Sequence, residues 1–215
     1  MHETTAGKLS LRNALAMAAF TIAFTALMAG TYLLTHDTIA KSAEAEKLTL
    51  IDAILPRTLY DNALLKDEIV LPPTPEIGLD DGGHAWRARR GGEPAALVIE
   101  AAAPDGYAGR IDLIVAVAHD GGLLGVRVTQ HRETPGLGDY IDPKKDKNKA
   151  RPWIGQFDNR RADLPADTWR VRKDGGAIDS MSGATISARA VTNAVGRVLA
   201  YVAAHRDQLF AEEPK

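Results

Sequence analysis

The most strongly apolar stretch of the sequence lies near its N-terminus, where residues 13–36 carry no Lys, Arg, Asp or Glu. As a helix, residues 13–34 measure roughly 33 Å, enough to cross a hydrocarbon core of about 30 Å. Lys8 and Arg12 precede this run, and positive charges gather on the cytoplasmic side of a span. We therefore predict a single-pass transmembrane helix in the inner membrane, with residues 1–12 in the cytoplasm and the soluble part on the outer, periplasmic side.

A cleaved signal peptide is the alternative for this segment, because Ala26–Gly30 supplies small residues of the cleavage type. The apolar core of a signal peptide measures about 7–15 residues, however, and this run is longer. The pattern favours an uncleaved anchor.

Residues 35–83 are expected to form a helix and a linker that lead into the outer domain. The helix is predicted over 42–55, because its apolar residues recur at helical spacing, and Pro56 ends it. The linker includes 71–83, which is rich in Pro, Gly and Asp. The apolar positions of the helix are Ala45, Leu48, Ile51 and Leu55.

The pattern then changes to β-branched, alternating runs, which are typical of strands. Two hairpins and a further short strand are expected, with a C-terminal helix in which Val recurs every three or four residues. The predicted fold class is α+β, one antiparallel sheet with flanking helices, in a single domain over 84–215. The expected strands are 84–89, 95–101, 110–118, 123–131 and Trp169–Lys173, and the helix includes Val191, Val195, Val198 and Val202.

Composition excludes several kinds of chemistry. The 215 residues include no cysteine, so disulfides, thiolate-bound iron–sulfur clusters and thiol nucleophiles are impossible. The formal net charge of −2 does not suit a nucleic-acid binder. None of the six histidines pairs with another at ligand spacing, so we expect no metal site, and no nucleotide or hydrolase motif assigns a catalytic residue.

Hydroxyl side chains and glycine gather just before the C-terminal helix, in Asp179-Ser180-Met181-Ser182-Gly183-Ala184-Thr185. A helix start presents unpaired N–H groups and the positive end of a dipole, which suits a phosphate. The simpler interpretation is helix capping, with Ser182 as the N-cap. Local chemistry leaves both interpretations open.

This segment resembles the flavinylation motif Asp-x-x-Ser/Thr-Gly-Ala-Thr of the FMN-binding domain family. A second segment, His131–Gly138, resembles the family's His-x-Glu-Thr-Pro-Gly-Leu-Gly stretch, and the resemblance extends over about 106–202. It implies FMN held by a phosphoester on Thr185. It also implies a recognition context of Asp179, Ser182, Gly183 and Ala184, a second hydroxyl at Ser187, and flavin contacts by Glu133, Thr134, Gly136 and Leu137.

The anchor and the outer FMN domain together resemble the G subunits of Rnf (Rsx) ion-translocating ferredoxin/NAD oxidoreductase complexes. The resemblance implies an electron relay that is not catalytic alone. Its implied partners are the complex's subunits A, B, C, D and E, a flavin transferase and membrane lipid. Two alternatives are the C subunit of the sodium-translocating NADH–quinone oxidoreductase and an anchored, non-redox binding module.

Three further features receive structural interpretations. Trp153 and Phe157 are expected in the core or as loop anchors, and His131 is expected to be structural. The lysine-rich stretch 144–151 is expected to be a solvated loop.

Overall fold

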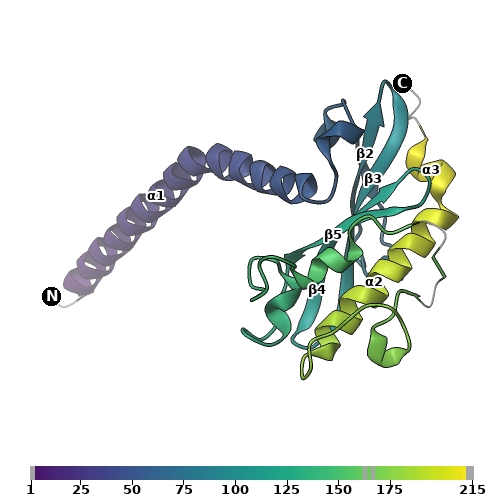
Figure 1. Ribbon diagram of the computed structural model, residues 1–215. Helices are drawn as coiled ribbons and strands as arrows, with labels where there is room; N and C mark the ends of the chain where they lie inside the picture. Colours follow the sequence, from purple (N-terminus) through teal and green to yellow (C-terminus); the bar gives the residue numbers. More distant parts are fainter. Residues whose placement is uncertain (1–2, 162–163, 166–167, 212–215) are drawn as a thin grey trace. The chain divides into compact units, whose positions relative to one another are not determined.

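The computed structural model describes residues 3–161, 164–165 and 168–211 (Figure 1). The chain forms two compact units, which divide between Leu48 and Thr49. We describe each unit by itself.

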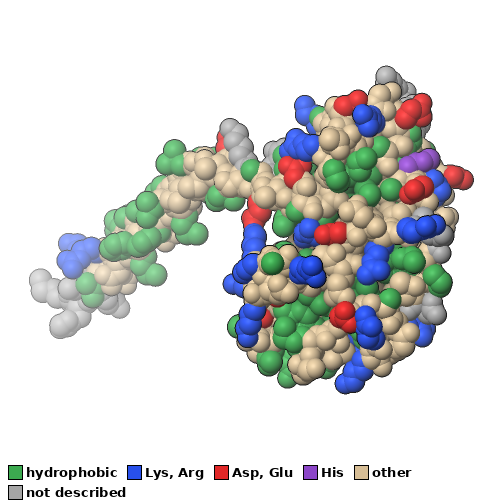
Figure 2. All heavy atoms as spheres, viewed as in Figure 1, with side chains coloured by type: hydrophobic (Ala, Val, Ile, Leu, Met, Phe, Trp, Pro, Cys, Tyr) green, Lys and Arg blue, Asp and Glu red, His purple; other side chains and the backbone are tan. Residues whose placement is uncertain are grey.

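The first unit consists of helix α1, which runs from Glu3 to Asp52 and enters the second unit with its last residues. Among the described residues, one helical segment, Lys8–Ile39, is long and apolar enough to cross a membrane. Its mean hydropathy is 1.8, and none of its most apolar window is buried. Figure 2 shows hydrophobic side chains gathered along this part of the helix.

The separate helix predicted over 42–55 is wrong in its bounds, because residues 13–34 and 42–52 belong to one continuous helix. Neither Gly nor Pro occurs between residues 31 and 55, so nothing in the sequence breaks it. The helix ends at Asp52, three residues before the predicted end, and a turn follows in which the Leu55 N–H donates to the Ile51 carbonyl.

The second unit contains an antiparallel meander of five strands in sequence order, which confirms the predicted fold class. Both predicted hairpins are present: Gly91 and Gly92 turn the first with positive φ, and Asp120 caps the second by accepting from the Gly122 N–H. The strands are β1 (Glu68–Leu71), β2 (Gly83–Arg90), β3 (Glu93–Gly106), β4 (Gly109–Ala118) and β5 (Leu123–Gln130).

Two elements differ from the predictions. The edge strand β1 lies inside the expected linker; it has four residues, of which only Leu71 is buried, so it shows little alternation. The strand predicted over Trp169–Lys173 is wrong. Val171 makes one isolated bridge to Ile178, and Arg172–Asp174 forms a 3₁₀ turn, so the alternating side chains there pack a loop.

Helix α2 (Thr185–Ala204) covers one face of the sheet and packs against β3, with the short helix α3 (Arg206–Phe210) after it (Figure 1). Its buried side includes Val191, Val195 and Val198, as the periodicity predicted. Trp153 and Phe157 join the same core, which confirms their expected role.

The other face of the sheet carries a second, smaller core. Its sheet side includes Trp86, Val98 and Ile114, and its cover is the segment around Ile51–Leu55 together with Leu64. The sheet is therefore buried on both faces, by α2 on one side and by the residues that follow the anchor on the other.

Candidate functional site

The segment 179–184 lies between the bridge at Ile178 and the start of α2. Gly183 adopts a left-handed φ of +84°, and a Cβ at this position would meet nothing within 4 Å. A ligand could therefore approach this backbone closely. Ser182 and Gly183 are both exposed.

The helix start carries no side-chain cap. The N-cap residue is Ala184, and it makes no capping hydrogen bond, so the interpretation of Ser182 as the N-cap is wrong. Thr185 is the first residue of α2 and is half-buried. Within the part of the chain that the structure describes, no side chain satisfies the first N–H groups of α2, which leaves them for an acceptor from outside.

Asp179 is held from three directions. Its carbonyl accepts from Trp153 Nε1, and its N–H donates to Gln156 Oε1 at 2.9 Å. Its carboxylate pairs with Arg172 Nε at 2.7 Å. The 3₁₀ turn Trp153–Phe157 thus anchors the beginning of the segment, a role for Trp153 and Gln156 that the sequence did not reveal.

Tyr140 holds the end of the segment. Its hydroxyl donates to the Ala184 carbonyl and accepts from the Met181 N–H, each at 3.1 Å. Burial raises the pKa of Tyr140 above its ordinary value, opposed by the Met181 N–H, so the phenol stays protonated and able to donate. Tyr140 is not among the residues that the sequence predicted for the site; its position two residues after the Gly-Leu-Gly turn is the only signal for it.

Glu133 is a buried carboxylate among the predicted site residues, with 4% of its surface exposed. Oε1 accepts from the Ala108 N–H at 3.0 Å, and Oε2 accepts from the Ser187 hydroxyl. The hydrogen bond from Ser187 joins the 131–138 segment to the first turn of α2, across 54 positions of sequence.

The Pro-Gly-Leu-Gly turn is held internally. The Gly136 N–H donates to Asp139 Oδ1 at 2.8 Å, and the Leu137 N–H donates to the Thr134 carbonyl at 3.1 Å. Gly136 has a φ of +77°, which only glycine adopts readily. His131 Nδ1 accepts from the Glu133 N–H at 3.2 Å, as expected for a structural histidine.

A pocket of about 130 Å³ brings the two motifs together. Thr185 lies between two of its lining residues but does not itself line it, and neither do Asp179, Ser182 and Gly136. Three exposed apolar side chains surround its mouth: Tyr107 (67% exposed), Leu137 (50%) and Ile186 (44%). The remaining lining residues are Glu133, Thr134, Gly138, Gly183, Ala184 and Ser187.

Comparisons with known proteins agree with both motifs and with the anchor. Residues 106–200 match the FMN-binding domain family, and residues 1–54 match the RnfG N-terminal region. Relatives named as the G subunit of the ion-translocating oxidoreductase complex are 39% identical in Pseudoalteromonas atlantica (93% of this chain, 91% of the relative) and 41% in Vibrio atlanticus (94% of each). A third, from Pseudomonas aeruginosa, is 40% identical (94% of this chain, 93% of the relative).

This chain belongs to the family of G subunits of ion-translocating oxidoreductase complexes. The predicted resemblance is confirmed, and FMN is the cofactor that its domain family binds. The name of the relatives also favours the Rnf-type interpretation over the quinone reductase alternative.

The geometry of the site in this G subunit suits FMN. An uncapped helix start with an open glycine before it suits a phosphate, and the apolar rim of the adjoining pocket suits a flat ring. Arg189, one turn into α2, is already engaged: its guanidinium forms two bonds with Asp174, at 2.5 and 2.8 Å, and holds the pKa of that carboxyl below its ordinary value. The Arg189 guanidinium is therefore occupied by Asp174, and the uncapped helix start remains as an anion-binding feature of the site.

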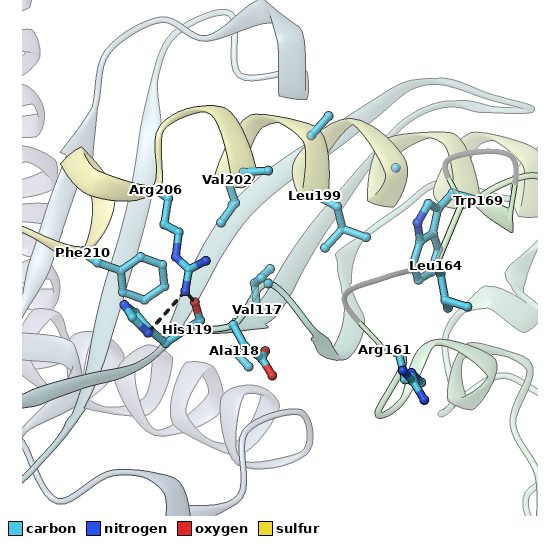
Figure 3. Close-up of a pocket in the computed structure, with 15 residues that line it drawn as sticks. Val117, Ala118, His119, Arg161, Leu164, Trp169, Leu199, Val202, Arg206 and Phe210 are labelled. Carbon is cyan, nitrogen blue, oxygen red and sulfur yellow. Dashed lines mark hydrogen bonds between the residues drawn. The ribbon is translucent and has the colours of Figure 1, made fainter.

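The other end of α2 borders a larger hollow of about 320 Å³, which contains none of the predicted site residues. Figure 3 shows Leu199 and Val202 of α2 facing this hollow, with Arg206 reaching toward His119. The Arg206 guanidinium donates to the His119 carbonyl. Among the residues that the structure describes, no group of three His, Cys, Asp or Glu side chains could hold a metal ion.

Proposed function

We propose that this chain is an electron-transfer subunit of an ion-translocating ferredoxin/NAD oxidoreductase complex, and that it works through FMN joined to Thr185 by a phosphoester. The carrying observation is the pocket in which the two motifs meet beside the uncapped start of α2. Bound FMN supplies one- or two-electron exchange, while the chain supplies attachment and surroundings.

The surroundings of the two hydroxyls support Thr185 over Ser187 as the acceptor. The Ser187 side chain is buried, and its hydroxyl donates a hydrogen bond to Glu133. Thr185 is half-buried at the helix start, and its hydroxyl has no hydrogen-bond partner among residues 3–161, 164–165 and 168–211. A phosphoester on Ser187 would break the bond to Glu133, whereas one on Thr185 breaks none.

The same layout suggests separate roles for the other predicted residues. Asp179, Ser182, Gly183 and Ala184 form the context that a flavin transferase reads before Thr185. The turn that carries Thr134, Gly136 and Leu137 adjoins the pocket. Because the pocket is smaller than the roughly 300 Å³ of ordinary ligand sites, the ring of FMN would be only partly enclosed and would stay within reach of a redox partner.

The attachment can be tested with the full chain, co-expressed with a flavin transferase. The denatured chain is viewed on a gel under ultraviolet light, and its intact mass is measured. We expect a fluorescent band and the added mass of FMN minus water, both absent in Thr185→Ala. Ser187→Ala, the matched control, keeps both. A dark parent band would favour the non-redox binding module. Loss of FMN only in Ser187→Ala would show that Ser187, and not Thr185, is the acceptor.

The charges of Lys8 and Arg12, which lie at the start of the candidate span Lys8–Ile39, support a membrane orientation. We propose an inner-membrane anchor with a cytoplasmic N-terminus and an outer domain that meets subunits A to E. A cysteine introduced on the exposed strand residue Val70 has no competing thiol in the chain. A membrane-impermeant reagent should label it in intact spheroplasts. Labelling only after lysis would show the opposite orientation, with the domain in the cytoplasm.

A further inference from the structure

The pocket beside Thr185 contains one buried carboxylate, that of Glu133. Both of its oxygens accept hydrogen bonds, from the Ala108 N–H and the Ser187 hydroxyl, which is the pattern of the charged form. Across the described part of the chain, no Lys, Arg or His forms an ion pair with it. The pocket wall therefore carries a negative charge that two neutral donors offset only in part.

Two glycines make room for this carboxylate. A Cβ at Gly106 would lie 2.8 Å from Oε1, and a Cβ at Gly138 would lie 2.6 Å from Oε2. Burying a carboxylate without a cation is unfavourable, and a neutral glutamine of the same shape would avoid that penalty. The structure thus accommodates a charge that packing alone does not require.

We infer that the Glu133 carboxylate lowers the midpoint potential of FMN held beside it. This inference rests on the proposed attachment at Thr185. An electron that bound FMN accepted without a proton would add negative charge next to Glu133, and the repulsion between the two charges would be strong where burial limits screening by water. The Ser187 hydroxyl, by donating to Oε2, weakens that repulsion.

Two substitutions should therefore shift the potential in opposite directions. Glu133→Gln removes the charge and keeps the shape, so the midpoint potential should become more positive. Ser187→Ala keeps the charge but removes a donor, so the potential should become more negative. If Glu133 had a purely structural role, the midpoint potential would shift in the same direction in both variants, because both alter the same Glu133–Ser187 contact.

The measurement is a spectroelectrochemical titration of flavin absorbance in the full, detergent-solubilised chain, with the FMN content of each variant fixed by intact mass. Asp139→Asn is the matched control: it makes the same change of carboxylate to amide at a residue outside the pocket lining, and should shift the potential less than Glu133→Gln.

The inference is overturned if Glu133→Gln leaves the potential unchanged or makes it more negative, or if Ser187→Ala moves it in the same direction as Glu133→Gln. The failure of the proposed function gives a different result, because the parent chain would then carry no covalent FMN at all. In that case both proposals fall together. Covalent FMN with equal potentials in the parent and both variants would sink this one alone.

Discussion

The two ends of α2 each border a pocket, and they differ in whether their polar groups already have partners. At the C-terminal end, His205 Nδ1 lies 3.0 Å from the Tyr201 carbonyl, and Arg206 is bonded to the His119 carbonyl. Cationic and imidazole groups of this kind suit the negative end of a helix. At the N-terminal end, the first N–H groups have no side-chain cap. The smaller pocket is the better candidate because the helix start beside it has no side-chain cap, so volume alone is a poor guide.

Substituting one glycine at each of the two pockets should give the largest contrast. In Gly138→Ala, the new Cβ would lie 2.4 Å from Ser187 Oγ, and overpacking of this kind costs roughly 3 kcal/mol. In Gly196→Ala, the Cβ would lie 3.1 Å from Trp169 Cβ, and the gain in helix propensity offsets part of that contact. The free energy of unfolding of Gly196→Ala should stay within about 1 kcal/mol of that of the parent.

Thermal unfolding followed by circular dichroism measures both variants. We expect a clear fall in Tm for Gly138→Ala and a small change for Gly196→Ala. Equal losses would show that the two ends are packed alike and would remove the contrast.

Removing one hydroxyl at the N-terminal end should have an intermediate effect. Tyr140→Phe leaves the Met181 N–H without its acceptor and the Ala184 carbonyl without its donor. The loss should be about 1–2 kcal/mol in denaturant unfolding, together with a lower fraction of flavinylated chain, because the segment before Thr185 loosens. Val98→Ala, a change in the second core on the other face of the sheet, serves as the control. An undiminished flavinylated fraction in Tyr140→Phe would contradict this account of Tyr140.

The smallest effect is expected at the C-terminal end. Arg206→Ala removes a bond to a carbonyl at an exposed position, which should cost less than about 1 kcal/mol and leave the FMN content unchanged. Intact mass and chemical denaturation check both statements. A marked loss of FMN would mean that the larger pocket also contributes to the site.

The sequence predicted those parts of the fold whose apolar pattern is long and regular. Strands β3 and β4 and helix α2 each span ten residues or more, and each contains a long series of apolar residues. Strand β1 was missed because four residues with one buried side chain show no period. The alternation at Trp169–Lys173 predicted a strand wrongly, since the pattern reports burial and not a pairing partner.

The candidate site was predictable only where its residues are contiguous. Resemblance over short segments located Thr185 and Glu133, but the contacts between segments depend on tertiary packing. The Glu133–Ser187 bond and the bond from Trp153 to Asp179 join residues 54 and 26 positions apart. No local pattern encodes such pairs, and for the same reason Tyr140 was overlooked.

The second core, in the unit that begins at Thr49, determines where this chain can be shortened. Ile51, Ile54 and Leu55 are almost fully buried against the sheet face that carries Trp86. A soluble fragment that began after Leu55 would expose that face to water and invite aggregation. A truncation that removes the apolar segment Lys8–Ile39 should therefore end before Thr49, where the second compact unit begins.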